Sequence, residues 1–219
     1  MFFAFDGLDG VGKTTQLELF CQWLEGQGRE VVRTVDPGTT PLGEQVRSVL
    51  LDRHGTRIDP LAEMLLFMAA RAQLVSETIL PALEAGKVVV SDRFLLANVV
   101  YQGYGRGLDV AAVWEVGRVA TAGVMPDLTV VLDMPPDAAS GRLARPLDRM
   151  ETAQDGAFRD RLRSGFLAEA CARPSAIVMI DGARPIEVVQ AEIRQRAEPV
   201  LARPGGVRLW TEPLEDRIE

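Results

Sequence analysis

Nine residues near the N-terminus have the composition and spacing of a loop that binds nucleotide phosphates. They fit the pattern G-x-x-x-x-G-K-[ST] and read, in order, Gly7, Leu8, Asp9, Gly10, Val11, Gly12, Lys13, Thr14 and Thr15. Glycines let backbone N–H groups turn toward phosphate oxygens, while the lysine can reach the outer phosphates and Thr14 can offer its hydroxyl to Mg²⁺. Lysine occurs only at Lys13 and Lys87, which indicates that the loop needs a compact ammonium.

The segments on either side of this loop are those that a phosphate site requires. Residues 2–5 form an apolar run typical of a buried strand, and residues 17–24 carry the apolar stripe of an amphipathic helix. A helix that begins directly after the loop presents its positive N-terminal end to a phosphate. A chance match is therefore a poor explanation, and the pattern predicts a nucleotide-phosphate site.

A second pair of candidate residues ends the expected buried strand of residues 87–93. These residues are Asp92 and Arg93. Because ligands collect at the carboxyl ends of strands in doubly wound sheets, we expect Asp92 to face a Mg²⁺ held by Thr14 and Arg93 to face a phosphate. A salt bridge that caps the strand is the alternative.

The longest helical pattern, from Leu61 to Glu84, carries two further candidates. Phe67 and Arg71 lie one turn apart, so the ring could stack on a base while the guanidinium donates to a base carbonyl. Simple core packing is the alternative for Phe67. The residues on this helix that we expect to face the core are Leu61, Leu65, Met68, Ala72, Val75 and Ile79.

Strands that alternate with helices determine the fold class. The expected strands span 2–5, 30–35, 87–93, 128–133 and 176–181. This order predicts an α/β protein with a P-loop NTPase fold, in which helices cover both faces of a five-stranded parallel sheet. We expect one domain over 1–203, with a last helix from Ile186 to Glu198 that Pro199 stops, and a tail over 204–219 without an assigned role.

Arginines gather in a segment of about residues 142–153, at Arg142, Arg145 and Arg149. Pro146 favours a bent, mobile segment over a regular helix. Clustered arginines on a movable segment suit a short lid that closes over a transferring phosphoryl group. A solvated charged loop is the alternative.

Composition limits the other classes of function. The chain has 219 residues and a net charge of −7, which argues against a broad nucleic-acid-binding surface. Two cysteines make no disulfide framework, the N-terminus lacks a signal-peptide pattern, and no uncharged apolar run could span a bilayer. We expect a cytoplasmic protein that binds neither nucleic acid nor a membrane.

Several separated motifs together resemble the thymidylate kinases. The matching segments are residues 7–15, Asp36-Pro37-Gly38-Thr39, Phe67-x-x-x-Arg71, Asp92-Arg93-Phe94, Tyr101-Gln102-Gly103, Gly105-Arg106-Gly107, Pro126-Asp127-Leu128-Thr129 and Leu147-Asp148-Arg149-Met150-Glu151. The resemblance extends over residues 1–200 or so and implies phosphorylation of dTMP to dTDP with ATP and Mg²⁺, in dTTP biosynthesis. It also implies a homodimer.

The resemblance implies a role for each matching residue. Phe67 would stack on thymine, Arg71 would bind its carbonyl, and Arg93 would hold the acceptor phosphate. Asp9 would bind the sugar 3′-hydroxyl or belong to the metal environment. The residues implied to form the rest of the substrate pocket are Asp36, Asn98, Tyr101 and Gln102, with Tyr101 crowding the place of a ribose 2′-hydroxyl. The implied catalytic residues are Lys13, Arg93, Arg142, Arg145 and Arg149, as in members that carry their catalytic arginine in the lid.

The chain departs from the family pattern at two places. The loop usually written Glu-Pro-Gly-Gly-Thr is Asp36-Pro37-Gly38-Thr39-Thr40, and Phe94 stands where tyrosine or histidine is common. Both departures concern details of substrate contact and leave the reaction class unchanged.

Three other functions fit part of the sequence. A deoxynucleoside kinase would share the phosphate loop but needs a carboxylate base near an acceptor hydroxyl, whereas here Asp92 adjoins Arg93. A GTP-binding switch would need an Asn-Lys-x-Asp motif, but the only asparagine, Asn98, is followed by Val99. A P-loop ATPase that is not a kinase fits the loop and leaves Phe67, Arg71 and the arginine-rich segment without a purpose.

Overall fold

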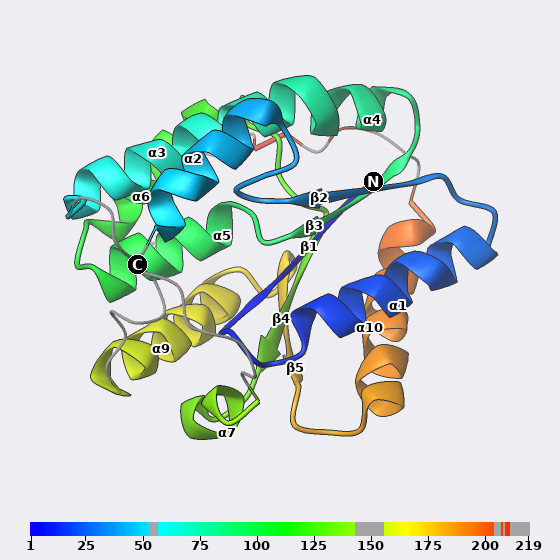
Figure 1. The fold of residues 1–219 in the computed structure, drawn as a ribbon. Helices are drawn as coiled ribbons and strands as arrows, with labels where there is room; N and C mark the ends of the chain where they lie inside the picture. Colours follow the sequence, from blue (N-terminus) through cyan, green and yellow to red (C-terminus); the bar gives the residue numbers. More distant parts are fainter. Residues whose placement is uncertain (53–56, 143–155, 204–206, 208, 211–219) are drawn as a thin grey trace.

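A parallel β-sheet runs through the centre of the molecule, with helices on both faces (Figure 1). The computed structural model describes the chain except for residues 53–56, 143–155, 204–206, 208 and 211–219. The strands are β1 (Phe2–Gly7), β2 (Val31–Val35), β3 (Val88–Asp92), β4 (Leu128–Asp133) and β5 (Ile177–Asp181). Their spatial order is β2-β3-β1-β4-β5, which confirms the predicted five-stranded parallel sheet.

The position of β1 in the sheet explains its composition. It pairs with β3 on one side and β4 on the other, with Phe2 opposite Val89 and Phe3 opposite Leu128. A strand buried on both faces reads as a continuous apolar run, and Phe2, Phe3, Ala4 and Phe5 are all buried.

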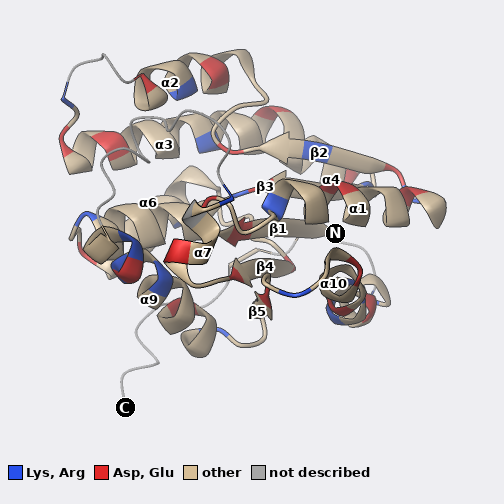
Figure 2. Ribbon diagram, turned by 60° about the horizontal axis from the view of Figure 1, so that its bottom comes forward, with Lys and Arg blue, Asp and Glu red and all other residues tan. Residues whose placement is uncertain are grey.

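The polar residues of the sheet gather at its carboxyl edge. Each of the five strands has an aspartate at or next to its carboxyl end. These aspartates are Asp6, Asp36, Asp92, Asp133 and Asp181. In Figure 2 the strands are mostly tan, while most charged residues lie on helices and connecting segments. One edge of an apolar sheet therefore carries concentrated negative charge.

Two helices cover one face of the sheet and a larger set covers the other (Figure 1). The first pair is α1 (Lys13–Gly26) and α10 (Ile186–Leu201). The opposite layer contains α3 (Pro60–Leu74), α5 (Leu95–Asn98), the π-helix η2 (Val99–Gly105), α6 (Val110–Ala120) and α9 (Gly156–Ala172). The remaining elements are α2 (Pro41–Leu51), which packs on α3, the π-helix η1 (Val75–Ile79), α4 (Leu80–Glu84) and α7 (Pro136–Ser140). In the described part of the chain, no helix has both the length and the apolar character that a membrane span needs.

The predicted core face of the helical segment from Leu61 to Glu84 is confirmed in part, since Met68, Val75 and Ile79 are buried. Leu61 and Leu65 are 52% and 48% exposed, so their assignment to the core was wrong. Glu63 and Arg71, each 1% exposed, lie inside instead. Glu63 and Arg71 lie on one stripe of the helix and have ionic partners inside the protein. Because this stripe faces inward, the two leucines lie on the outer side of the helix.

The predicted end of the last helix was also wrong. α10 continues through Pro199 to Leu201, because Val200 and Leu201 pack into the core and hold the last turn in place. A proline inside a helix costs about 3 kcal/mol, and the burial of two apolar side chains, at about 1.5 to 3 kcal/mol each, offsets that cost.

Candidate active site

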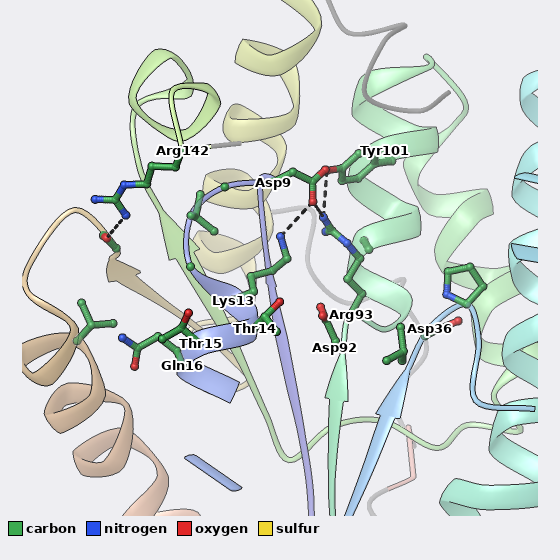
Figure 3. Close-up of a pocket in the computed structure, with 18 of the residues that line it drawn as sticks. Asp9, Lys13, Thr14, Thr15, Gln16, Asp36, Asp92, Arg93, Tyr101 and Arg142 are labelled. Carbon is green, nitrogen blue, oxygen red and sulfur yellow. Dashed lines mark hydrogen bonds and ion pairs between the residues drawn. The ribbon is translucent and has the colours of Figure 1, made fainter. Parts of the chain in front are cut away.

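A cavity of about 960 Å³ opens at the carboxyl edge of the sheet, where the strand ends and helix starts converge (Figure 3). Most of the candidate residues named from the sequence line it: Asp9, Gly10, Val11, Gly12, Lys13, Thr14, Thr15, Asp36, Phe67, Arg71, Asp92, Arg93, Asn98, Tyr101, Gln102 and Arg142. Gly7 and Leu8 lie in the loop behind this lining, while Arg145 and Arg149 are outside the described residues. One cavity thus unites residues that are up to 133 positions apart.

The phosphate loop joins β1 to α1 and is pressed against neighbouring backbone. A Cβ atom at Gly10 would lie 2.1 Å from the carbonyl oxygen of Ala139, and one at Gly7 would lie 2.4 Å from that of Leu132. Both glycines also have positive φ angles, 86° and 127°, which L residues rarely adopt. The two glycines are therefore required by close packing as well as by backbone conformation.

Lys13 begins α1 and folds back over the loop. Its Nζ atom donates to the carbonyl oxygens of Leu8, at 2.7 Å, and Gly7, at 3.2 Å, and lies 3.3 Å from a carboxylate oxygen of Asp9. The side chain is 8% exposed, and burial lowers its pKa, with Arg93 acting in the same direction and Asp9 in the opposite one. This compact cation is positioned at the floor of the cavity.

Arg93, which directly follows β3, is held by two aspartates, one on β1 and one in the phosphate loop. Its Nη1 atom lies 2.9 Å from Asp6 Oδ1, and its Nη2 atom lies 2.6 Å from Asp9 Oδ1. The same guanidinium stacks over the Tyr101 ring, whose hydroxyl is 3.4 Å from Asp9 Oδ2. Asp9 therefore lies between the two cations Lys13 and Arg93 (Figure 3).

These contacts bear on the alternative of a strand-capping salt bridge. Among the described residues, the carboxylate partners of Arg93 are Asp6 and Asp9 and not its neighbour Asp92. Its φ angle of 67° turns the chain sharply after β3 and directs the side chain across β1. Asp92 lines the cavity separately.

The two aspartates that bind Arg93 respond differently to the same surroundings. Burial raises the pKa of Asp6 to about 6, and the opposing effects of Arg93 and Lys13 are smaller. Burial also acts to raise the pKa of Asp9, but Arg93 and Lys13 together outweigh it and hold that pKa well below its usual value. Asp6 is fully buried, and its Oδ2 atom has no hydrogen-bond partner in the described part of the chain, which explains the difference.

Arg71 is the centre of a second polar cluster. It is 1% exposed and pairs through Nε with Asp36, while its Nη1 atom donates to Asn98 Oδ1 at 2.6 Å. Its guanidinium also lies over the Phe94 ring, 5.4 Å from the centroid. Burial raises the pKa of Asp36, and Arg71 opposes that shift. Since Phe67 and Arg71 both line the cavity, a flat ligand would meet a ring and a fixed guanidinium.

The departure from the family loop has a visible structural consequence. Thr39, which stands where the resemblance expects a glycine, has a φ angle of 67°. Its hydroxyl accepts a hydrogen bond from the Val35 N–H at 2.8 Å and donates to the Val35 carbonyl at 3.3 Å. The loop keeps a backbone conformation suited to glycine, and the threonine side chain ties it to the end of β2.

Two oxygen-bearing side chains meet the requirements of a magnesium ion. The Thr14 hydroxyl and the Asp92 carboxylate both line the cavity beside Lys13 (Figure 3). Magnesium prefers hard oxygen ligands, commonly one or two protein groups together with phosphate oxygens and water. The residues present fit such an ion.

The cavity extends past the phosphate loop toward α10. Arg142 donates to the carbonyl oxygen of Gly182 at 3.4 Å and lines this end with Arg184 and Ile186. Reasoning from the sequence missed several lining residues, namely Gln16, Arg47, Gly182, Ala183, Arg184, Pro185, Ile186 and Val189. The Asp181-Gly182 turn after the last strand was an available signal, because ligands bind at strand ends.

The fold and the site together define a P-loop nucleotide-binding protein of the α/β class. A glycine loop between a central parallel strand and a helix supplies backbone N–H groups and a lysine for phosphates. A second cation, the guanidinium of Arg93, lines the same cavity, as do the ring of Phe67 and the guanidinium of Arg71.

Comparison with known proteins identifies the family. Residues 5–193 match the family model described as thymidylate kinase. The chain is 46% identical over 205 residues to the thymidylate kinase of Clavibacter sepedonicus, covering 92% of this chain and 96% of that one. It is 45% identical over 203 residues to that of Pelotomaculum thermopropionicum, covering 91% and 94%. The crystal structure of thymidylate kinase from Ehrlichia chaffeensis is similar, with a TM-score of 0.74, 32% identity and coverage of 90% and 98%. This chain belongs to the thymidylate kinase family.

Proposed function

We propose that this enzyme transfers the γ-phosphoryl group of ATP to the 5′-phosphate of dTMP and releases dTDP and ADP. Membership of the thymidylate kinase family supports nucleotide substrates and ATP as the donor. The observation that carries the proposal is that Lys13 and Arg93 share the carboxylate of Asp9 inside one cavity. Two phosphate-binding cations on opposite sides of one carboxylate suit two phosphate groups that must meet.

The reaction needs no covalent intermediate with the protein. An oxygen of the acceptor phosphate forms a bond to the γ-phosphorus, and the bond from that phosphorus to the bridging oxygen breaks, with its electron pair leaving on ADP. Catalysis then consists of positioning and of charge neutralisation by Lys13 and Arg93. Both cations can exchange their contact with Asp9 for contacts with phosphate oxygens.

Magnesium is part of the proposal because the donor set fits it. Thr14 and Asp92 would hold the ion, which supplies positive charge next to the phosphate oxygens when it is bound. The residues of this chain would do the rest: the loop N–H groups orient the donor phosphates, and Lys13 neutralises them.

The acceptor base would lie between Phe67 and the Arg71 cluster. Arg71 would donate to a base carbonyl, Asp36 would hold that guanidinium in place, and Tyr101 would bound the sugar. Asn98 and Gln102 would complete the pocket. Asp9 would act at the junction of the sugar and the two cations.

Other parts of the proposal rest on family resemblance and local sequence. They are catalysis by Arg142, Arg145 and Arg149, a lid over about residues 142–153, a homodimer and a cytoplasmic location. Arg142 borders the cavity, whereas Arg145 and Arg149 lie outside the described residues.

An ADP-release assay with ATP and Mg²⁺ tests the proposal, comparing dTMP, dUMP, dCMP, UMP and thymidine as acceptors. We expect the highest kcat/KM with dTMP. Activity on thymidine without activity on dTMP would show that the acceptor is a hydroxyl and would favour a deoxynucleoside kinase. Hydrolysis of ATP that no acceptor stimulates would favour an ATPase.

A further inference from the structure

A chain of buried polar side chains leads away from the cavity behind Arg71. Arg71 Nη1 donates to Asn98 Oδ1 at 2.6 Å, Asn98 Nδ2 donates to Gln102 Oε1 at 2.7 Å, and Gln102 Nε2 donates to Glu63 Oε1 at 3.0 Å. Glu63 is 1% exposed and does not line the cavity, while the other three residues do. Its charge is compensated by Arg106, whose Nε atom lies 3.3 Å away.

The two ends of this chain determine the orientation of both amides. A guanidinium can only donate hydrogen bonds and a carboxylate can only accept them. Turning Asn98 around would face its NH₂ group toward the Arg71 donors, and turning Gln102 around would face its carbonyl toward the Glu63 carboxylate. Because the cluster is almost completely buried, no water compensates such a mismatch cheaply. The amide orientations are therefore fixed by opposite charges at opposite ends.

This fixed orientation has a consequence for the base. Arg71 offers donors to the cavity, and Asn98 offers a carbonyl oxygen with a second lone pair. A 4-oxopyrimidine presents a carbonyl acceptor next to an N3–H donor, which matches this pattern. Cytosine presents an amino donor next to an N3 acceptor, which opposes it at both positions. Sites that leave buried polar groups unpaired discriminate strongly.

We propose that Glu63 is a positioning residue that makes the site select 4-oxopyrimidine nucleotides over cytosine nucleotides, by fixing the Asn98 amide through Gln102. This inference rests on the proposed function and deepens it. Glu63 touches no substrate and acts only through the polarity of the two amides.

Glu63→Gln is the direct test, because glutamine has the same shape but its amide can also donate. If both the Asn98 and the Gln102 amides then turned around, the only mismatched hydrogen bond would be the one to Arg71. The preference for 4-oxopyrimidine nucleotides over cytosine nucleotides should therefore weaken. The matched control is Glu169→Gln. Glu169 is another buried glutamate, 3% exposed, which accepts from Tyr104 Oη at 3.0 Å and Trp114 Nε1 at 3.1 Å and lies outside the cavity lining.

The readout is the ratio of kcat/KM for dTMP to kcat/KM for dCMP. We expect Glu63→Gln to lower this ratio about tenfold, with kcat at saturating dTMP changed less than about threefold. Glu169→Gln should keep the wild-type ratio even if its melting temperature falls. An unchanged ratio in Glu63→Gln, or an equal fall in Glu169→Gln, would overturn the proposal.

A second measurement needs no activity. Asn98 is the only asparagine in the chain, so asparagine-selective ¹⁵N labelling gives one side-chain NH₂ signal pair. In the wild type we expect one proton of the pair to be protected from exchange by its bond to Gln102, and in Glu63→Gln the pair to shift or broaden. Rapid exchange of both protons in the wild type would overturn the proposal even if Glu63→Gln does not fold. A wild type that leaves dTMP unphosphorylated would refute the proposed function instead, and the NMR result would still test the polar chain.

Discussion

The two ends of the cavity contain different kinds of polar side chain. At the end that we propose binds the phosphates, called here the phosphate end, Lys13 and Arg93 both contact Asp9, and Arg93 also contacts Asp6. At the end that we propose binds the base, called the base end, Arg71 is paired with Asp36 and continues into the amides of Asn98 and Gln102. The first cluster consists almost wholly of full charges, whereas the second alternates charges with neutral amides.

This difference indicates that the two ends have different functions. Full charges at the phosphate end can exchange one anionic partner for another, so a phosphate can displace the Asp9 carboxylate from either cation. The base end holds its donors and acceptors in place before and after binding, because every link is a directional hydrogen bond inside the protein. The phosphate end should therefore control rate, and the base end should control which nucleotide is accepted.

The largest expected effect is at the phosphate end. Lys13→Ala should lower kcat/KM about 10³-fold, because the substitution removes a buried cation that neutralises the transferring group. ADP release under saturating ATP measures it. Lys87→Ala is the matched control, since Lys87 is the only other lysine and forms a surface pair with Glu30. A loss below about tenfold in Lys13→Ala would place the phosphates elsewhere.

Arg93→Lys should have the next largest effect, a fall of about 100-fold in kcat/KM for dTMP. Lysine keeps the charge but has a single nitrogen, whereas the guanidinium reaches Asp6 with Nη1 at 2.9 Å and Asp9 with Nη2 at 2.6 Å. Arg33→Lys, at an exposed pair with Glu25, should leave the rate unchanged. Equal rates for Arg93→Lys and the wild type would mean that only net charge matters at this end.

The two aspartates of the phosphate end should affect stability with opposite signs. The pKa of Asp6 in the folded protein, about 6, lies above its ordinary value of 3.8, so the folded state holds the proton more tightly. The free energy of unfolding of the wild type, relative to that of Asp6→Asn, should thus fall by on the order of 2 kcal/mol as pH rises from about 4 to 6.

Asp9 provides the opposite case. Its lowered pKa means that its stabilisation is present above the ordinary value of 3.8 and is lost as pH falls below it. Urea unfolding of wild type, Asp6→Asn and Asp9→Asn between pH 3 and pH 8 measures both effects. Parallel pH curves for the three proteins would refute the assigned difference between the two carboxyls.

Phe67→Ala sharpens the comparison from the base end and should have the smallest effect. We expect KM for dTMP to rise about tenfold with kcat within about threefold, since base stacking contributes binding more than rate. Val119→Ala, on the exposed side of α6, is the control. A fall in kcat as large as the rise in KM would contradict the assignment of rate to the phosphate end alone.

The phosphate end could be recognised from the sequence because its parts are local. A glycine loop, its lysine and the strand and helix beside it are contiguous, and the periodicity of the flanking residues reveals both elements. Aspartates at strand ends were also visible, because a parallel sheet brings the carboxyl ends of its strands together.

The sequence could not show in the same way which of the aspartates at this edge of the sheet bind Arg93. Asp92 adjoins Arg93 in the chain, yet Asp6 and Asp9, more than 80 positions away, are the carboxylates that bind it. The pairing follows from the register of β1 against β3 and from the positive φ of Arg93. Neither is encoded in local spacing.

The sequence alone determined the sheet, the phosphate loop and the position of Phe67 and Arg71 on the same stripe of one helix. Each of these features depends on residues that are only a few positions apart. Glu63 belongs to that same stripe at i, i+4 and i+8, but only the folded protein shows that it is buried against Gln102 and Arg106 rather than exposed. The face that α3 turns inward was decided by partners on η2 and by Asp36 at the end of β2. Burial of a charge depends on what three-dimensional packing places opposite it, and no local pattern carries that information.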